Sequence, residues 1–204
     1  MPTDYSDNLY NNSQKIVFHH SPSGTSLSFK AFDINYAENI VNNWETTELV
    51  WRVNQRHTWQ SVRRNITLGW SMPAFNLEEA KSNLQKCSTM VRYMYPMVDA
   101  DGNIAGSNPI WHLGVMNWAH NPNSPRAGDL SDTLLMGFPT NFDWNIINSD
   151  GFLYEPDGGV DPYPKNIKVS LTWMCILDET TRYGYDENSG QWAGPAHFPW
   201  TTGG

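Results

Sequence analysis

Apolar and polar residues alternate with a period of two in several stretches of the chain, a pattern typical of β-strands with one buried face. The clearest stretch covers residues 64–72. Its apolar side consists of Ile66, Leu68, Trp70 and Met72, and its polar side consists of Asn65, Thr67, Gly69 and Ser71. Residues 138–146 and 165–177 alternate in the same way. Residues 110–118 are apolar on both sides, which predicts a buried strand.

Residues 27–36 also alternate, but the apolar set changes phase by one residue after Ala31. A one-residue slip within a strand predicts a β-bulge. A further short extended segment is expected over residues 49–53.

One long helix is predicted among these strands. Its apolar residues recur at spacings of three and four and form one stripe: Leu77, Ala80, Leu84, Cys87, Val91 and Met94. Asn76 is suited to cap the start, Glu79 completes a capping-box pattern, and Pro96 ends the helix. A helix over about residues 76–95 would measure roughly 28 Å, enough to cover one face of a sheet.

These elements predict a mainly β, α+β fold of antiparallel strands with one long helix. The small polar residues on one side of each strand indicate a sheet with one face in water. In a ring of subunits, such a face would line a channel with neutral groups that do not hold a passing polyanion. We expect an N-terminal polar arm over residues 1–25, a β domain over 26–182, and an extended, aromatic-rich C-terminal arm over 183–204.

The composition favours a folded chain with aromatic residues at its interaction surfaces. Aromatic residues make up 13 % of the chain and include ten tryptophans, more than a core of this size usually holds, so some are expected at interfaces. The net charge of −8 argues against broad nucleic-acid binding. Four arginines fall within thirteen residues: Arg52, Arg56, Arg63 and Arg64. They form either a solvated basic loop or a basic edge that meets an acidic edge of a neighbouring subunit.

Sequence motifs of catalysis are missing. The chain has no G-x-S-x-G, P-loop, G-x-G-x-x-G or H-E-x-x-H pattern, and its six histidines lack metal-ligand spacing. Asp99 opens an aspartate-rich segment that lacks the glycine and glutamate of a calcium loop and is expected to be a turn. Cys87 and Cys175 are expected to be buried free thiols. We therefore expect no catalytic residue, no metal and no cofactor. The absence of a signal peptide or a long apolar run predicts folding in a cytoplasm and no membrane contact.

The order of segments resembles the baseplate tail-tube proteins of contractile-tailed bacteriophages. The motifs that carry the resemblance are, in chain order, residues 29–32, Trp44, residues 49–52, Gln60, residues 64–70, Glu79-Ala80, residues 93–96, residues 109–117, residues 136–138 and residues 163–171. They span about residues 26–179. Trp51 stands where the family pattern has glycine, and residues 183–204 have no counterpart, which favours a specialised ring at the baseplate end over the repeated tube.

The resemblance implies an antiparallel β-sandwich or barrel of tail-tube type, assembled into hexameric rings whose strands join in a continuous inner barrel. It implies contacts with neighbouring tail-tube and baseplate hub proteins and with the tape-measure protein, and transient passage of DNA without specific binding. The location would be the virion tail, assembled in the host cytoplasm. The expected channel-lining residues are Asn65, Thr67, Ser71, Ser170 and Thr172. The expected interface residues are Arg52, Arg56, Arg63, Trp192, Phe198 and Trp200.

A carbohydrate-binding β-sandwich module of a tail fibre or a secreted protein is the alternative. Exposed tryptophans on a β-scaffold can stack on sugar rings, and ten tryptophans make that class of function plausible. Two long terminal arms favour an assembly protein instead, because such proteins use arms to tie subunits together.

Overall fold

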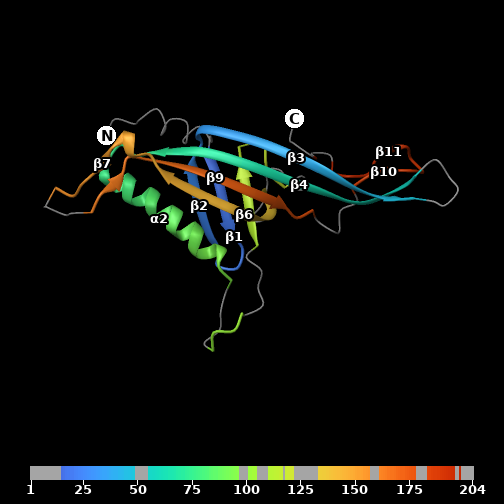
Figure 1. The fold of residues 1–204 in the computed structure, drawn as a ribbon, viewed down its shortest axis with the longest axis horizontal. Coiled ribbons are helices and arrows are strands. Elements are labelled where there is room, and N and C mark those ends of the chain that lie inside the picture. The colour runs from blue at the N-terminus through green and yellow to red at the C-terminus, as the bar shows by residue number, and fades with distance from the viewer. Residues whose placement is uncertain are drawn as a thin grey trace.

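A seven-stranded antiparallel sheet forms the body of the protein (Figure 1). The computed structural model describes residues 15–48, 55–96, 101–104, 110–116, 118–121, 133–156, 161–177, 183–195 and 198. The strands of the sheet are β1 (Lys15–His20), β2 (Thr25–Lys30), β3 (Phe32–Thr47), β4 (Arg56–Pro73), β5 (Trp111–Val115), β6 (Leu135–Ile146) and β9 (Asn166–Cys175). Their order in the sheet is β2-β1-β5-β6-β9-β4-β3.

The smaller elements lie around this sheet. The helix α2 (Leu77–Met94) follows β4, and a short 3-10 helix, η1 (Asn148–Asp150), follows β6. Two small hairpins are formed by β7 (Phe152–Leu153) with β8 (Tyr163–Pro164), and by β10 (Tyr185–Asp186) with β11 (Gln191–Trp192).

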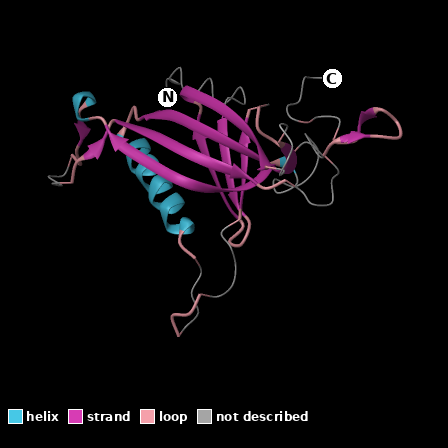
Figure 2. Ribbon diagram, turned by 45° about the vertical axis from the view of Figure 1, so that its right-hand side comes forward, coloured by secondary structure: helices cyan, strands magenta, loops and turns pink. Residues whose placement is uncertain are grey.

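The sheet folds over on itself and makes two layers. Phe18 of β1 lies 6.0 Å from Trp70 of β4 and 6.2 Å from Trp173 of β9, measured between ring centroids. Three strands separate β1 from β4 in the sheet, and in a flat sheet with about 4.8 Å between neighbours the two would lie roughly 19 Å apart. The corner is the junction of β5 with β6, which is limited to the pairs of Trp111, His112 and Leu113 with Gly137, Met136 and Leu135. Figures 1 and 2 show the shorter strands β1 and β2 running across the long strands.

The structure confirms a mainly β, antiparallel fold with one long helix. The two layers come from one continuous sheet, and this sheet does not close into a barrel, because its end strands β2 and β3 are not hydrogen-bonded to each other.

The core lies between the two layers and follows the alternation in the sequence. In β4, the side chains of Ile66, Leu68, Trp70 and Met72 are all buried, as predicted. In β9, the alternating set Ile167, Val169, Leu171, Trp173 and Cys175 is buried as well. The β5 strand is buried over most of its length, as predicted, but it covers only Trp111–Val115 of the predicted residues 110–118, and His112 on its outer side is half-buried.

The helix begins and ends where the sequence predicts. The Glu79 amide donates to the Asn76 side chain at 2.8 Å, and a Glu79 carboxylate oxygen accepts from the Phe75 amide at 2.9 Å. Only two of the six residues in the predicted buried stripe are buried, because the buried residues are Ala80, Asn83, Cys87 and Met90. Leu84 and Val91 lie at the margin of the buried face.

Tertiary contacts set the rotation of this helix. Residues spaced by seven on one flank contact the layer of β1 and β2: Glu79 pairs with Lys30, Lys86 lies over the Phe29 ring, and Tyr93 stacks on His20. On the other flank, Lys81 pairs with Glu155 and lies over the ring of Tyr163 in β8. The helix therefore bridges the layer of β1 and β2 and the β7–β8 hairpin. Its apolar residues Cys87 and Met90 belong to the core.

The predicted β-bulge is present at the start of β3. The pairing of β3 with β4 shifts register between Phe32 and Asn35, and Asp33 adopts a left-handed φ of 51°. This kink, together with Ala31, lets the chain leave β2 at one end of the sheet and enter β3 at the other.

Both predicted arms need correction within the described residues. Lys15–His20 is a strand of the sheet, paired with β2 and β5, and its residues Ile16 and Phe18 are fully buried. The chain before Lys15 lies outside the described residues. At the other end, residues 183–195 turn back on themselves in the β10–β11 hairpin and do not form an extended arm. The segment predicted over residues 49–53 also lies outside the described residues.

The corner of the sheet gives a first prediction. A Cβ atom at Gly137 would lie 2.3 Å from the Met174 carbonyl oxygen and 2.5 Å from Nε1 of Trp173, with no room to move. We expect Gly137→Ala to lower the free energy of unfolding by about 1–3 kcal/mol, measured by urea denaturation. Gly184→Ala is the control, because a Cβ there meets no atom within 4 Å. Equal stability of both variants would contradict this account of the corner.

Candidate assembly surfaces

The outer face of the long strands carries small polar residues. Thr67 lies directly opposite Thr172 across β4 and β9, and Gly69 lies opposite Ser170. Thr67 and Ser170 are exposed, and Asn65 and Thr172 are half-buried. Four of the five predicted channel-lining side chains thus lie together on one water-facing side of the sheet.

Ser71 lines a groove on the same face but, unlike the other four, it is buried. Its side chain is 3 % exposed, and its hydroxyl donates to a carboxylate oxygen of Asp33 at 3.3 Å. The bulge of β3 covers this position, since Phe32 pairs directly with Ser71. The sequence predicted the bulge but not which neighbour it would cover.

The polar face continues onto the two flanking strands. On β3 it includes Asn35, Ala37 and Asn39, which pair with Gly69, Thr67 and Asn65. On β6 it includes Asn141, Asp143 and Asn145, which pair with Thr172, Ser170 and Lys168. A shallow groove of about 340 Å³ crosses this face at Gly69, between Asp33 and Asp143. Apart from these two acids and Lys168, the groove presents amides, hydroxyls and backbone.

This four-stranded part of the sheet has two open edges among the described residues. No described strand pairs with β3 on the side away from β4. On β6, pairing with β5 ends at Gly137, so Phe138–Ile146 is covered on the β9 side alone. Long open edges are sites where strands of another chain add on.

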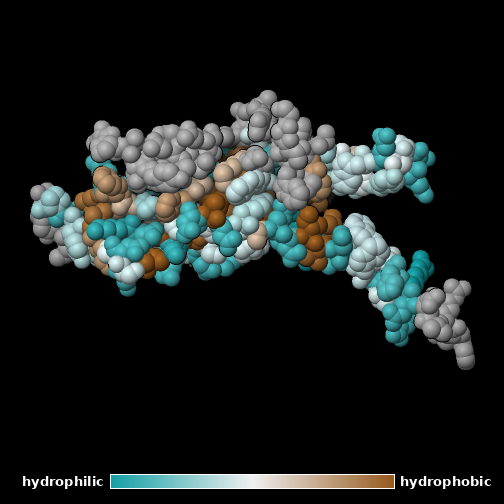
Figure 3. Space-filling view, turned by 90° about the horizontal axis from the view of Figure 1, so that it is seen from above, coloured by the Kyte–Doolittle hydropathy of each residue, from teal (hydrophilic) through white to brown (hydrophobic). Residues whose placement is uncertain are grey.

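The β3–β4 pair extends beyond the core as a two-stranded ribbon. Cross-strand hydrogen bonds stiffen it: Asn43 with Ser61 at 3.1 Å, Gln60 with Glu45 at 2.6 Å and Thr46 with His57 at 3.0 Å. Trp44 and Trp59 pair directly across the ribbon and are 59 % and 52 % exposed. Ile40 and Val41 are also exposed nearer the body, and Figure 3 shows the ribbon and the β10–β11 hairpin as two separate projections.

The predicted interface arginines lie on this ribbon where they are described. Arg56 and Arg63 are exposed, opposite Thr47 and Val41 respectively. Arg52 lies outside the described residues. Arg64 differs from its neighbours, because it is 2 % exposed and points to the core side.

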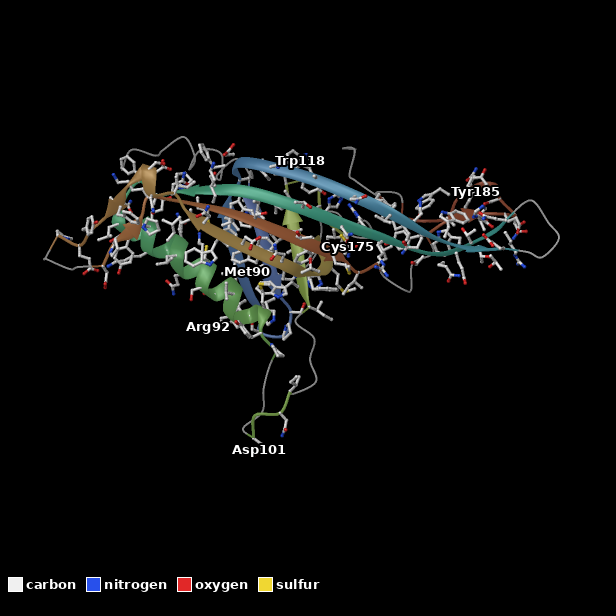
Figure 4. The ribbon with its side chains drawn as sticks, viewed as in Figure 1. Met90, Arg92, Asp101, Trp118, Cys175 and Tyr185 are labelled. Carbon is white, nitrogen blue, oxygen red and sulfur yellow. The ribbon has the colours of Figure 1, made fainter. Side chains whose placement is uncertain are left out.

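The C-terminal hairpin is held by an aromatic cluster. Phe198 packs on Tyr183 at 5.1 Å and stacks on Trp192 at 5.7 Å, between ring centroids. The Arg64 guanidinium lies 5.5 Å from the centre of the Phe198 ring. Phe198 therefore makes contacts within its own chain, whereas Tyr185 and Trp192 stay exposed, and Figure 4 shows Tyr185 far from the core. Trp200 lies outside the described residues.

A buried ion pair joins β3 to β4 beneath this cluster. Nε of Arg64 donates to Oε1 of Glu38, and both side chains are shielded from solvent, at 2 % and 7 % exposure. The Tyr36 hydroxyl donates to the other Glu38 oxygen at 3.2 Å. Burial, and next the negative charge of Glu38, raise the pKa of Tyr36, so its hydroxyl stays protonated as a hydrogen-bond donor.

A pocket of about 660 Å³ opens beside this pair. Its described lining consists of Ile34, Asn35, Tyr36, Glu38 and Trp118. Tyr36 and Trp118 lie 5.5 Å apart between ring centroids, and Figure 4 shows Trp118 beside β3. The pocket is open to solvent, and its described lining contains no pair of groups arranged as nucleophile and base.

No group of three or more His, Cys, Asp or Glu side chains gathers in the described part of the chain. Cys87 and Cys175 are buried and free, as predicted, and burial raises the pKa of each thiol to about 12, which keeps it out of the reactive thiolate form. In the same part of the chain, no helix has the length and hydrophobicity needed to cross a bilayer.

Comparison with known proteins adds no relative. A scan of known protein families finds no match for this chain, and a search of curated proteins finds none either.

Sequence reasoning missed three features of these candidate surfaces. The polar face is wider than predicted, because Asn35, Asn39 and Asn141 were not connected to Thr67 until the strand register was known. The Trp44–Trp59 pair depends on the hairpin register in the same way. The third, the burial of Arg64, has a signal in the sequence: Arg64 begins the alternating set that continues with Ile66 and Leu68.

Proposed function

We propose that this chain is a structural subunit of a ring in the tail tube of a contractile-tailed bacteriophage, at or near the baseplate. The observation that carries the proposal is the four-stranded sheet β6-β9-β4-β3, which is open at both long edges among the described residues and faces water with mostly small, neutral side chains. A sheet with two unpaired edge strands and one polar face is suited to pair with neighbouring copies, edge strand to edge strand, around an axis.

The ring forms when β3 of one subunit adds to the open part of β6 in the next. Both edges are long: β3 covers Phe32–Thr47, and the open part of β6 covers Phe138–Ile146. Six copies of a four-stranded sheet close into one barrel. With about 4.8 Å between strands and a tilt of about 40°, the backbone diameter of this barrel is roughly 48 Å. The lumen of this barrel remains wider than a DNA duplex after the inward-facing side chains are taken into account.

The chemistry of the polar face suits a passage for DNA. Hydroxyls and amides such as those of Thr67, Ser170 and Asn141 offer no fixed positive charge, so phosphates gain no counterion-release energy on contact. Asp143 and Lys168 contribute opposite charges on neighbouring strands. DNA would pass such a wall without being bound.

The two projections provide contacts with other rings and proteins. The ribbon carries exposed Trp44, Trp59, Arg56 and Arg63. The hairpin carries exposed Tyr185, Trp192 and Glu187 and the half-buried Asp186. Aromatic residues and arginine are the types enriched in interface cores, and opposite charges set orientation. The partners would be neighbouring tail-tube and baseplate hub proteins, with the tape-measure protein in the channel, and no catalysis is required.

Electron microscopy of the purified chain tests this proposal. We expect rings of six copies with an open lumen, whose population grows with protein concentration in light scattering, and density that places Thr67 and Ser170 on the lumen wall. A chain that stays monomeric at all concentrations, or rings in which this face points outwards, would overturn it.

Sugar binding remains a second candidate because of the Trp44–Trp59 pair. Two exposed rings on directly paired residues of the ribbon form a surface on which sugar rings could stack. A glycan array separates the two functions. Binding that is lost in Trp44→Ala and Trp59→Ala variants of a monomeric chain would favour a carbohydrate-binding module.

A further inference from the structure

Two histidines face each other on the outer side of the layer formed by β2, β1 and β5. His19 of β1 and His112 of β5 are directly paired in register, and both are half-buried. Their ring centroids lie 6.0 Å apart. Their neighbours in sequence do not share this arrangement: His20 points to the core side, where it is 3 % exposed and stacks on Tyr93.

Each of the two rings is oriented by a serine through the same nitrogen. Nδ1 of His19 is hydrogen-bonded to the Ser26 hydroxyl at 2.9 Å, and Nδ1 of His112 is hydrogen-bonded to the Ser21 hydroxyl at 2.9 Å. In the tautomer with Nδ1–H donating to the serine oxygen, Nε2 carries the lone pair. A hydrogen-bond acceptor on the second ring nitrogen is the usual support of a metal-binding histidine, because it fixes the tautomer and the ring orientation.

The separation of the rings fits a shared metal ion. A metal at about 2.0–2.1 Å from a histidine nitrogen lies roughly 3.2 Å from the ring centroid, so two rings on one ion have centroids at most about 6.4 Å apart. The observed 6.0 Å is within this limit, and two Nε2 atoms that face one ion at this separation would subtend a wide angle at it. A small rotation of either side chain closes the angle further.

A third donor lies on the same face. Met136 of β6 pairs directly with His112, so the row across three strands is His19, His112 and Met136. Two imidazoles with a thioether suit copper, and two imidazoles with water suit copper, nickel or zinc. The described residues place no carboxylate directly opposite His19 or His112 in the sheet, so the donor set is nitrogen and sulfur and does not suit calcium or magnesium.

We propose that His19 and His112 bind one first-row transition metal ion, with Cu²⁺ preferred over Zn²⁺, and with Met136 as a weak third ligand. The ion links β1 to β5 on the outer surface of the layer, away from the four-stranded polar face. This site is independent of the proposed function, because it uses none of the residues of the polar face, the ribbon or the open edges.

Calorimetric titration of the tag-free full chain with CuCl₂, and separately with ZnCl₂, tests the site. We expect one ion per chain, with Cu²⁺ binding more tightly. His19→Ala and His112→Ala are each expected to weaken Cu²⁺ binding by at least about tenfold, since loss of even a supporting residue costs about 10–100-fold. His57→Ala is the matched control: His57 lies in a paired strand, and its Nδ1 is likewise hydrogen-bonded to a hydroxyl, that of Thr46 at 3.0 Å, but no histidine faces it.

Electron paramagnetic resonance of the Cu²⁺ complex gives a second readout. Coupling to two histidine nitrogens is expected in the parent chain and to one in each single variant, with circular dichroism confirming that the variants fold. The proposal is overturned if the parent chain binds no more tightly than the His19→Ala/His112→Ala double variant, or if His57→Ala weakens binding as much as the other two.

Discussion

Rings built from a Thr67→Arg/Ser170→Arg variant are expected to hold duplex DNA, whereas parent rings release it. The two positions are exposed on neighbouring strands of the polar face, close to each other because Thr67 pairs with Thr172 and Ser170 pairs with Gly69. In a hexameric ring each subunit would add two positive charges to the lumen wall. Each phosphate neutralised by arginine releases counterions, so the affinity for DNA rises by orders of magnitude and falls steeply as salt is added.

Binding of a labelled duplex to the assembled rings, measured over a range of salt concentrations, provides the check. The control is a Gln85→Arg variant, because Gln85 is exposed on the outer side of α2 and adds the same type of charge away from the proposed lumen. Gain of DNA binding by the Gln85 variant to the same degree as by the double variant would contradict the assignment of the polar face to a channel.

Removing the Arg64 side chain is expected to produce the largest loss of stability. Arg64→Ala removes the arginine that pairs with the Glu38 carboxylate, whose side chain is only 7 % exposed, and it also removes the cation over the Phe198 ring. Breaking a buried ion pair from one side typically costs about 3–5 kcal/mol. Urea denaturation of the purified variant, followed by tryptophan fluorescence, measures the loss.

A double variant separates the charge from the packing. Arg64→Met combined with Glu38→Leu is expected to regain most of the lost stability, because no buried charge is then left unpaired. Lys81→Ala, which breaks the half-exposed pair with Glu155, is the surface control and should change stability little. A loss at Lys81 as large as that at Arg64 would contradict the special role of burial.

Much of the fold could be predicted because alternation and capping are local properties. The apolar set from Ile66 to Met72 is buried because successive side chains of a strand point to opposite faces, whatever the strand packs against. The start of the helix at Asn76 follows from its side chain, which accepts a hydrogen bond from the Glu79 amide without any partner from elsewhere.

The candidate site was less predictable because it depends on pairing. Thr67 and Ser170 could be assigned to polar faces from their own strands, but their placement side by side required the β4–β9 register. Ser71 belongs to the same polar set by alternation, yet the β3 bulge covers it. His19 and His112 are 93 residues apart in the sequence, and nothing local connects them.

The sequence by itself determined the strand faces, the ends of the helix, the bulge after Ala31 and the burial of both cysteines, because each depends on neighbouring residues or on hydrophobicity alone. The tertiary structure alone decided that Lys15–His20 belongs to the sheet, that the helix turns Asn83 and Met90 inwards, and that residues 183–195 fold back as a hairpin. These outcomes depend on contacts between distant segments, whose free energy is settled only when the two layers meet around Phe18, Trp70 and Trp173.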